Sequence, residues 1–524
     1  MNIGLISPYP DIQSFGLRTL SACLKQEGHN VKIVFLLSQF WDKYEDQPLN
    51  ETVDLLKDCD LIGLSVMSNF WDNSVQITER LKKDIDAPII WGGTHPTIRP
   101  EECIERGGAD IVCIGEGEET LIELASKMEN GDDYSSIEGI GLKDNGETVI
   151  NKTRPLTVDL DVFPFQDYDF ETHYVLDGNN MDNYKYGKAN DHLSKMTLDL
   201  LKKHSMGDYV TMPTRGCPFG CAFCVNDTLN KMYAGQPIIR KRSMGNLMKE
   251  LKEIKKNLPY VNNIYFDDDS FILLSTEQIK EFSEEYKEHI DLPLSVTGIT
   301  PSTLRKDKLT HLVDAGVQFI RMGLQSGNEA IKEDYKRNYS NKKVESSVAI
   351  INEFKEEMGP PQYDIILDNP WETDENLEET LMFLTKLPAP YRLGFYSLTF
   401  YPETELYDKA KKDGIIKDGF VHDLNDVYRK TYNGIQKTYL NRIFFLLSAS
   451  MGTMSTRTMS LLLNKKVRKL KLGMVLYAIL SIKYAMLSRL ILEALKDLKK
   501  GEFYRLKRWF FRKIPMLRPM KGTL

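Results

Sequence analysis

The chain has 524 residues and a mass of 60.3 kDa, which is enough for about three domains with buried cores. Apolar residues make up 42% and charged residues 27%, an ordinary globular composition that excludes wholesale disorder and fibrous structure. The formal net charge of −7 conceals an asymmetry, because residues 457–524 carry +15 and the preceding residues carry −22. A basic end on an acidic body predicts an anionic partner for that end.

Seven cysteines are too few for a disulfide scaffold in a chain of this length. Residues Met1–Pro8 read as a short strand and lack the basic and apolar regions of a signal peptide. No stretch reaches the roughly 18 uncharged apolar residues that a transmembrane helix needs. We therefore expect a cytoplasmic protein with reduced thiols.

Short apolar runs alternate with amphipathic stretches over residues 1–150. The expected strands are Ile3–Ile6, Val31–Leu37, Leu61–Val66, Pro88–Trp91 and Ile111–Ile114. Continuous apolar strands separated by helices predict a parallel sheet covered on both faces, which is a doubly wound, Rossmann-like α/β domain. No G-x-G-x-x-G motif follows the first strand, so a dinucleotide is not favoured.

Sheets of this kind bind ligands in the loops at the carboxyl ends of their strands. Three such loops are rich in glycine and small polar residues: Ser65–Asn69, Gly92–Pro96 and Gly115–Glu118. Ordinary turn chemistry explains any one of them, but three at successive strand ends favour a ligand cleft.

Residues 151–208 look like an irregular connector, with a polar, Asn-rich loop from Asn179 to His192. From 209 to 420 the alternation of strands and helices resumes. The expected strands are Tyr209–Pro213, Asn263–Phe266, Leu294–Gly298, Phe319–Leu324, Tyr363–Leu367 and Leu393–Thr399. Six strand–helix repeats predict a second parallel sheet, curved or partly closed, and residues 421–524 read as mostly helical.

Three cysteines, Cys217, Cys221 and Cys224, follow the first strand of this second region at C-x3-C-x2-C spacing. Three thiolates can hold a 4Fe–4S cluster, whose usual ligand set is four cysteines, so one iron stays open for reaction. A zinc loop completed by a distant histidine, or buried free thiols, is the alternative interpretation. The other cysteines, Cys23, Cys59, Cys103 and Cys113, are scattered and are expected to be small core residues.

The three-cysteine motif resembles that of the radical S-adenosylmethionine (SAM) superfamily. The resemblance implies a partial (β/α)6 barrel, a 4Fe–4S cluster on the three cysteines, and SAM bound to the open iron and cleaved to a 5′-deoxyadenosyl radical. It also implies an oxygen-sensitive enzyme and an electron donor such as flavodoxin or ferredoxin. Phe223, the aromatic residue before the third cysteine, would pack near the adenine.

Further motifs agree with this resemblance. Tyr265-Phe-Asp267-Asp268-Asp269 ends the second barrel strand, where the family places polar groups for the methionine amino group; a solvated turn or helix cap is the alternative for any one of the three carboxylates. Gly323-Leu-Gln325-Ser326-Gly327 resembles the family's Gly-x-Glu-Ser-Gly motif near the SAM ribose, with a neutral amide replacing the glutamate. Asp368–Thr373 resembles Gly-x-Pro-Gly-Glu-Thr, and its Trp371 is expected to narrow the mouth of the site.

The N-terminal loops resemble the cobalamin-binding domain fused to many radical SAM enzymes. Gly92-Gly93-Thr94-His95-Pro-Thr and Ala109–Glu118, which includes Gly115 and Glu116, carry that likeness. The resemblance implies cobalamin, with Ser65–Phe70 at its lower face and Gly92, Gly93 and Thr94 at its nucleotide tail. No histidine has Asp two positions before it, so the Asp-x-His-x-x-Gly signature is absent. A loop histidine before proline is more often a local hydrogen-bonding residue than a ligand, and we expect the same of His95.

Together the two resemblances imply a cobalamin-dependent radical SAM enzyme, with methylation of an unactivated carbon in a small or lipid-like substrate as the leading function. A radical cyclase or oxidase of the same architecture is the alternative. A non-catalytic iron–sulfur or cobalamin sensor is a third hypothesis, which the open iron position argues against.

The C-terminal segment combines a long helical pattern at Leu461–Leu498 with alternating basic and aromatic residues from Lys499 to Lys513. Aromatic residues among lysine and arginine are typical of a membrane surface that carries anionic lipid. RNA could use the same residue types, although no nucleic-acid module accompanies them. Peripheral membrane contact, RNA, and packing on the barrel remain open for this segment.

Overall fold

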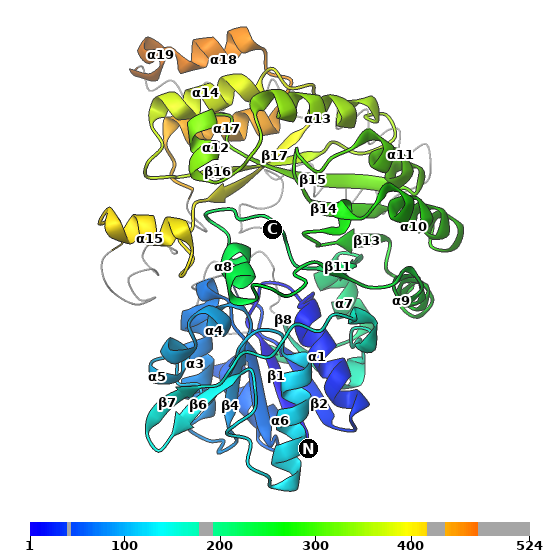
Figure 1. Cartoon of the computed structure of the whole chain (residues 1–524), viewed down its shortest axis with the longest axis vertical. Coiled ribbons are helices and arrows are strands. Elements are labelled where there is room, and N and C mark those ends of the chain that lie inside the picture. Colours follow the sequence, from blue (N-terminus) through cyan, green and yellow to red (C-terminus); the bar gives the residue numbers. More distant parts are fainter. Residues whose placement is uncertain (39–42, 178–191, 417–434, 470–524) are drawn as a thin grey trace.

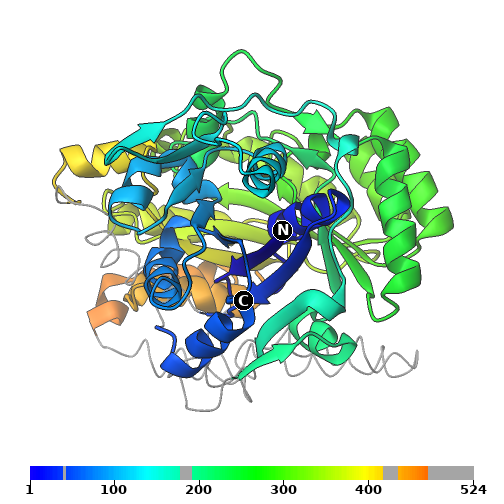
Figure 2. The same ribbon diagram turned by 90° about the horizontal axis from the view of Figure 1, so that it is seen from below.

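The computed structural model describes residues 1–38, 43–177, 192–416 and 435–469. They form two large sheets that lie one beyond the other along the long axis of the molecule, together with a short two-stranded sheet (Figure 1; Figure 2). Each large sheet is covered by helices that alternate with its strands in the sequence. The predicted fold class, an α/β chain with a Rossmann-like sheet followed by a second βα unit, is confirmed.

The N-terminal sheet has nine strands in the order β7-β6-β5-β4-β3-β1-β2-β8-β9. Its central strands are parallel and nearly fully buried, which is the reason their sequences are continuously apolar. These strands are β1 (Asn2–Ser7), β2 (Asn30–Phe35), β3 (Leu61–Ser65), β4 (Ile89–Gly92) and β5 (Ile111–Cys113). The covering helices include α1 (Phe15–Gln26), α2 (Asp46–Leu56), α3 (Trp71–Leu81) and α6 (Glu118–Asn130).

The edges of this sheet were not predicted. A hairpin, β6 (Ile140–Asp144) and β7 (Glu147–Ile150), adds antiparallel strands beyond β5. The connector expected to be irregular contains β8 (His173–Asp177), β9 (His192–Lys195) and α7 (Leu198–Ser205), so that part of the prediction was wrong. These elements are short and polar at their ends, which leaves no hydrophobic period to detect. The Asn-rich loop expected there lies, except for His192, outside the described residues.

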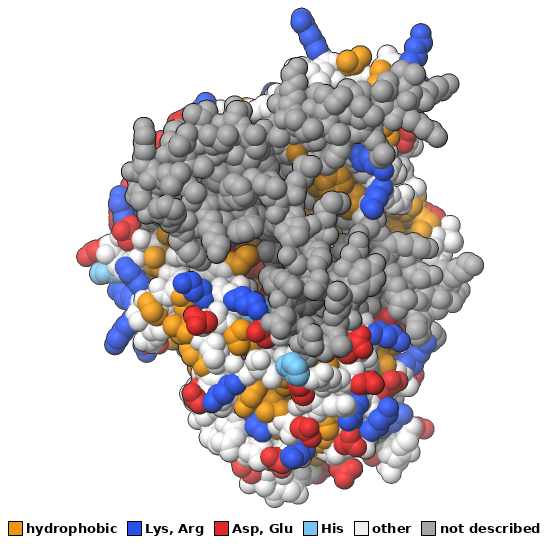
Figure 3. All heavy atoms as spheres, turned by 180° about the vertical axis from the view of Figure 1, so that it is seen from behind, with side chains coloured by type: hydrophobic (Ala, Val, Ile, Leu, Met, Phe, Trp, Pro, Cys, Tyr) orange, Lys and Arg blue, Asp and Glu red, His pale blue; other side chains and the backbone are white. Residues whose placement is uncertain are grey.

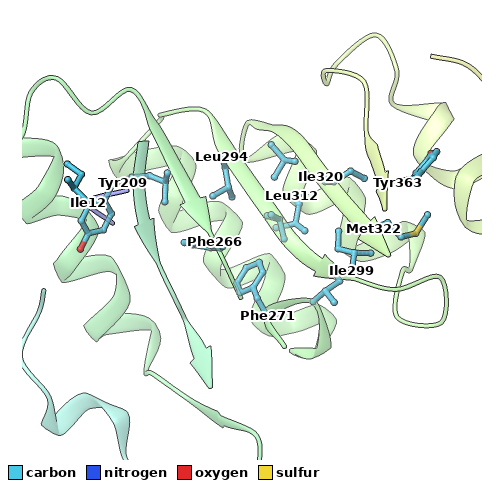
Figure 4. Packing of buried hydrophobic residues seen from close by; sticks show 14 of the residues in the cluster. Ile12, Tyr209, Phe266, Phe271, Leu294, Ile299, Leu312, Ile320, Met322 and Tyr363 are labelled. Atoms are coloured by element: carbon cyan, nitrogen blue, oxygen red, sulfur yellow. The ribbon is translucent and has the colours of Figure 1, made fainter. Parts of the chain in front are cut away.

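The second sheet has six parallel strands in sequence order: β10 (Asp208–Thr211), β13 (Asn263–Phe266), β14 (Leu294–Ile299), β15 (Val317–Gln325), β16 (Gln362–Leu367) and β17 (Arg392–Ser397). The two outer strands do not pair with each other, so the predicted partial barrel is confirmed. Its core helices include α9 (Met244–Asn257), α10 (Thr276–His289), α11 (Lys306–Asp314), α13 (Asn341–Glu353) and α14 (Asp374–Leu384). Figure 4 shows the side chains that these strands and helices bury, among them Phe266, Phe271 and Leu312.

The described C-terminal helices pack on the barrel. They are α17 (Tyr439–Ala449), α18 (Thr456–Leu463) and α19 (Lys465–Lys469), and α17 contacts β17 and α14. Arg468 pairs with Glu378 and lies 3.2 Å from Asp374, both on α14. The basic tail beyond residue 469, with most of its predicted long helix, lies outside the described residues.

Within the part of the chain that the structure describes, no helix is both long and apolar enough to cross a bilayer. On the face seen in Figure 3, acidic and basic side chains are interspersed over the described N-terminal region, without a patch of one sign.

Candidate active site

The cysteine loop lies between the two sheets. It begins after β10 with a two-residue strand, β11 (Thr214–Arg215), and ends where α8 (Val225–Met232) begins, and Figure 1 shows α8 between the sheets. Gly216 has a φ of +91°, and a Cβ there would lie 2.0 Å from the carbonyl oxygen of Ile238. Only glycine fits such a left-handed turn against backbone, so the loop shape depends on this residue.

Several hydrogen bonds fasten this loop to the barrel. Asn230 Nδ2 donates to the carbonyl of Cys217 at 2.8 Å. The amide of Ala222 donates to the carbonyl of Tyr335 at 3.2 Å, and the carbonyl of Ala222 accepts from the amide of Leu406 at 3.0 Å. The three cysteines are therefore held on an anchored loop.

The donor chemistry of this loop fits an iron–sulfur cluster. All seven cysteines are free; Cys221 is buried, Cys217 and Cys224 are half-buried, and the other four are buried as expected for core residues. Among the described residues, no three His, Cys, Asp or Glu side chains converge on a single metal ion. A 4Fe–4S cluster needs no such convergence, because each thiolate binds a different iron. Burial raises the pKa of Cys217 to about 11 and that of Cys224 to about 12, so ligation at neutral pH must release their protons.

Arg337 is a residue of this site that the sequence analysis missed. Its guanidinium is close to Cys221, with Nη1 3.1 Å from Sγ. Nη2 donates to the carbonyl of Gly323 at 3.1 Å, and Nε donates to the Tyr339 hydroxyl at 3.1 Å. One cation thus links a predicted ligand to the carboxyl end of β15. A lone arginine ten residues beyond the Gly-Leu-Gln-Ser-Gly motif gives no signal in a single sequence.

The three adjacent aspartates differ in their surroundings. Asp268 is buried and accepts four hydrogen bonds from protein groups, two from Thr214 at 2.6 and 2.5 Å and one each from the amides of Ser270 and Phe271 at 2.7 Å. Its carboxylate therefore holds β11 to the end of β13. Asp267 and Asp269 are exposed, and Asp269 accepts from Asn226 Nδ2 at 2.8 Å. These two carboxylates are the ones accessible to a ligand.

Gln325 and Ser326, the next two predicted site residues, also differ in how far they are buried. Gln325 is half-buried with a φ of +65°. Ser326 is buried, and its Oγ lies 3.0 Å from Thr380 Oγ1 and accepts from the amide of Asn328 at 3.1 Å. Gln325 is thus partly accessible, whereas Ser326 is buried and stabilises the turn.

Phe223 is half-buried beside the cysteines and meets Tyr335 edge-on, with ring centroids 5.5 Å apart. Trp371 donates from Nε1 to Asp413 at 2.8 Å, and the ammonium of Lys409 lies 4.4 Å from its ring centroid. Its indole is thereby tied to the segment around α15 (Glu405–Lys412).

Glu372 is a second group that was not predicted as a site residue. Its Oε2 is buried and has no hydrogen-bond partner in the part of the chain that the structure describes. Burial, together with the nearby Asp368, raises the pKa of Glu372 to about 8. At neutral pH this carboxyl is largely protonated and can donate a hydrogen bond.

The predicted cobalamin loops lie together at the carboxyl ends of β3, β4 and β5. Ser65 ends β3, and its Oγ lies 2.9 Å from the Tyr9 hydroxyl. Gly92 ends β4; Gly93 has a φ of +104°, and a Cβ there would lie 3.0 Å from the carbonyl oxygen of Val66. Thr94 begins α4 (Thr94–Ile98). Gly93 thus lets neighbouring strand ends approach closely.

His95 is fully buried beneath this surface. Its Nδ1 lies 2.8 Å from Ser68 Oγ, and its ring meets Trp71 edge-on with centroids 5.0 Å apart. Burial and the nearby Arg99 lower the pKa of His95 to about 3, so the imidazole is neutral. His95 therefore acts as a local hydrogen-bonding residue, because its contact with Ser68 supports the Ser65–Phe70 loop.

Gly115 and Glu116 follow β5 and touch the second domain. Gly115 has a φ of +87°, and a Cβ there would lie 1.9 Å from the hydroxyl of Tyr233. Both carboxylate oxygens of Glu116 accept from Arg240, at 2.7 and 2.8 Å. The strand ends of the N-terminal sheet therefore contact the segment that carries the cysteines.

Comparison with known proteins agrees with this arrangement. A B12-binding domain model matches residues 1–125, and a radical SAM superfamily model matches residues 211–384. The chain is a radical SAM enzyme with an N-terminal B12-binding domain. The two domains of this radical SAM enzyme fit the cofactor set expected from the sequence, a 4Fe–4S cluster, SAM and cobalamin.

The chain is similar to several methyltransferases at low sequence identity. An uncharacterised methyltransferase of Pyrococcus horikoshii is 24% identical over 408 residues, which covers 76% of this chain and 79% of the relative. The bacteriochlorophyllide d C-8(2)-methyltransferase of Chlorobaculum tepidum is 24% identical over 386 residues, covering 71% and 72%. The solved structure of the cobalamin-dependent SAM radical enzyme OxsB has a TM-score of 0.62 at 17% identity, covering 97% of this chain and 83% of OxsB.

Proposed function

We propose that this radical SAM enzyme is a cobalamin-dependent methyltransferase that methylates an unactivated carbon of a small or lipid-like substrate. The observation that best supports the proposal is the contact between the two predicted cofactor regions, where Gly115 and Glu116 meet Tyr233 and Arg240. A methyl carrier and a radical source must act on one substrate, and this contact brings their loops together. Two relatives are named as methyltransferases, and one of them acts at the C-8(2) position of bacteriochlorophyllide d, which supports the reaction class.

In this proposal Cys217, Cys221 and Cys224 hold the cluster, with Arg337 as the half-buried cation beside Cys221. When bound, the cluster and SAM supply a 5′-deoxyadenosyl radical, and cobalamin supplies the methyl group. Asp267 and Asp269 are the carboxylates available to the SAM amino group. The residues proposed beside the nucleoside are Phe223 and Gln325, with Ser326 supporting the turn.

The cobalamin loops are proposed to be Ser65, Gly92, Gly93, Thr94 and Gly115, which share one sheet edge. A Cβ at Gly93 would crowd the Val66 carbonyl, so glycine lets the end of β4 lie close to the Ser65–Phe70 loop. His95 supplies no accessible nitrogen, and it is proposed to support the Ser65–Phe70 loop from beneath.

Anaerobic reconstitution tests the cofactor claim. We expect about four iron and four sulfide per chain, one cobalt after loading with hydroxocobalamin, and formation of 5′-deoxyadenosine from SAM after reduction. Replacing all three cysteines with alanine should abolish iron binding and leave cobalt binding intact. Full retention of iron by that variant, or a wild-type chain that takes up no cobalt, would contradict the proposal.

The physiological electron donor is proposed to be a flavodoxin or ferredoxin, and the tail is proposed to contact an anionic membrane surface in the cytoplasm. The first is tested by replacing the chemical reductant with a reduced flavodoxin. The second is tested by co-sedimentation with phosphatidylserine liposomes. Equal binding by the whole chain and by a chain ending at Leu498 would dismiss residues 499–524 as the contact.

A further inference from the structure

The cysteine loop follows a short two-stranded antiparallel ribbon in which two positively charged side chains lie opposite each other. β11 pairs antiparallel with β12 (Arg240–Lys241), and the register places Arg215 directly opposite Arg240. Like charges opposite each other on paired strands repel and weaken the pair. Because the ribbon is only two residues long on each strand, it has few other hydrogen bonds to offset that repulsion. Arg215 also stands two residues before Cys217.

Two carboxylates of the B12-binding domain neutralise this ribbon. Glu116 accepts two hydrogen bonds from Arg240, at 2.7 and 2.8 Å, and its Oε1 lies 3.2 Å from Arg215 Nη1. Glu118, the first residue of α6, accepts from Arg215 Nη2 at 2.6 Å. The side chains of Arg240 and Glu118 are 4% and 6% exposed. Charge-assisted hydrogen bonds of this kind are strong when they are shielded from water, and breaking one leaves a buried charge unpaired.

Further contacts stabilise this junction between the B12-binding domain and the cysteine ribbon. Burial would raise the pKa of Glu116, but Arg240 and Arg215 outweigh it and hold the carboxyl below its usual range, so Glu116 stays ionised. Arg240 also donates to the carbonyl of Thr157 at 2.9 Å. The guanidinium of Arg215 lies 5.3 Å from the ring centroid of Phe163. The junction therefore joins the β5–α6 loop, the connector and the cysteine ribbon.

We propose that Glu116, Glu118, Arg215 and Arg240 form an interdomain clasp, and that the two glutamates are positioning residues that hold the cysteine loop at a fixed place on the B12-binding domain. Glu116 thereby has a different role from the cofactor contact expected from the sequence, since protein cations occupy its carboxylate. The contact itself does not depend on the proposed function; only what it positions, one cofactor site relative to the other, rests on that function.

Hydrogen exchange of the metal-free, reduced full chain tests the clasp without any cofactor. In the Glu116→Gln variant Arg240 loses its carboxylate partner and Arg215 keeps only Glu118. Exchange in residues 211–224 should therefore quicken by about tenfold or more, while β15 keeps its wild-type rate. Adding Arg240→Gln removes the repulsion, so the double variant should recover protection. Asp314→Asn, which removes the exposed 2.7 Å pair with Lys287, is the matched control and should change nothing in the loop.

Two results would overturn the clasp. One is exchange in 211–224 that stays within about twofold of wild type in Glu116→Gln. The other is additive loss of protection in the double variant, because independent residues would show no coupling. If Glu116→Gln does not fold, the same comparison is made with Glu118→Gln, which removes the 2.6 Å partner of Arg215, and with Glu118→Gln combined with Arg215→Gln.

The positioning of one cofactor site relative to the other is tested separately, in protein that carries both the cluster and cobalamin. The probes are hydroxocobalamin reduced to cob(II)alamin and the reduced cluster, whose magnetic interaction is read by electron paramagnetic resonance. The Glu116→Gln variant should keep the iron and cobalt content of wild type yet alter that interaction, and the double variant should restore it. An unchanged interaction at equal cofactor content would refute positioning. Absence of iron or cobalt in wild type would instead refute the proposed function and leave the exchange result standing.

Discussion

At the scale of single residues, Arg337 is expected to control how firmly the cluster is held. Its guanidinium donates to Cys221 Sγ at 3.1 Å, and hydrogen bonds to charged groups contribute about 1.5–3 kcal/mol. Arg337→Met should therefore lose iron to a chelator roughly tenfold faster or more than wild type. Arg337→Lys should lie between the two, because it keeps the charge without the forked geometry.

The control for Arg337 is Arg305→Met, which removes an exposed arginine paired with Asp307 at 2.8 Å. Iron retention is measured as iron per chain over time in the presence of chelator. Equal retention in Arg337→Met and Arg305→Met would show that the guanidinium does not stabilise the thiolate.

A second residue-scale prediction concerns Glu372 and pH. Its pKa is raised to about 8 by burial and by Asp368, so between the ordinary carboxyl pKa and pH 8 the folded state binds a proton that the unfolded state has lost. The free energy of unfolding contributed by this group therefore falls as pH rises through that range. Glu372→Gln cannot ionise and should remove this decline, so its advantage over wild type should grow from pH 5 to pH 8.

The measurement is denaturant unfolding of the metal-free chain at several pH values. The matched control is Glu375→Gln, an exposed glutamate at the start of α14 whose pKa is lowered, first by its own backbone amide. Its change in stability should have the opposite sign, because a lowered pKa favours wild type above the carboxyl range, by a difference that stays constant from pH 5 to pH 8. A pH dependence of Glu372→Gln identical to wild type would contradict the buried, protonated carboxyl.

At the scale of elements, the cysteine loop depends on one backbone conformation. Gly216→Ala places a Cβ 2.0 Å from a backbone oxygen, whereas Gly235→Ala at a similar φ of +88° meets nothing within 4 Å. Left-handed strain alone costs of order 1–3 kcal/mol, and only Gly216→Ala adds a steric clash. Gly216→Ala should therefore lower the melting temperature further and reduce iron content, and Gly235→Ala should keep its iron. Equal iron content in both would contradict the account of the loop.

The burial of each element explains whether it could be predicted from the sequence. Each central strand of both sheets was predicted, because parallel strands buried on both faces, such as β1 and β14, leave a continuous apolar run. The strands β8 and β9 were missed, because their polar ends carry no period. The C-x3-C-x2-C motif identified the cysteine loop, since metal ligands must recur at fixed spacing. Arg337 and the clasp partners come from distant segments, so their encounter depends on the fold.

At the scale of the whole molecule, ion pairs join the two domains. The clasp places two glutamates of the B12-binding domain against two arginines of the cysteine ribbon, so opposite charges meet where the predicted cofactor regions meet. The B12-binding domain is thereby tied to the barrel by ion pairs as well as by apolar packing. Electrostatic contacts of this kind fix register, which a reaction shared by two cofactors requires.

Carbon methylation is tested most directly by comparing the metabolites and lipids of a strain that lacks this gene with those of the wild type. Both strains are fed methionine labelled with deuterium in its methyl group. Carbon methylation predicts a wild-type compound that carries one labelled methyl group, and its unmethylated precursor should accumulate in the deletion strain. A precursor that differs from the product by two hydrogens or by oxygen, with no label transferred, would contradict methylation and assign the enzyme to ring closure or oxidation.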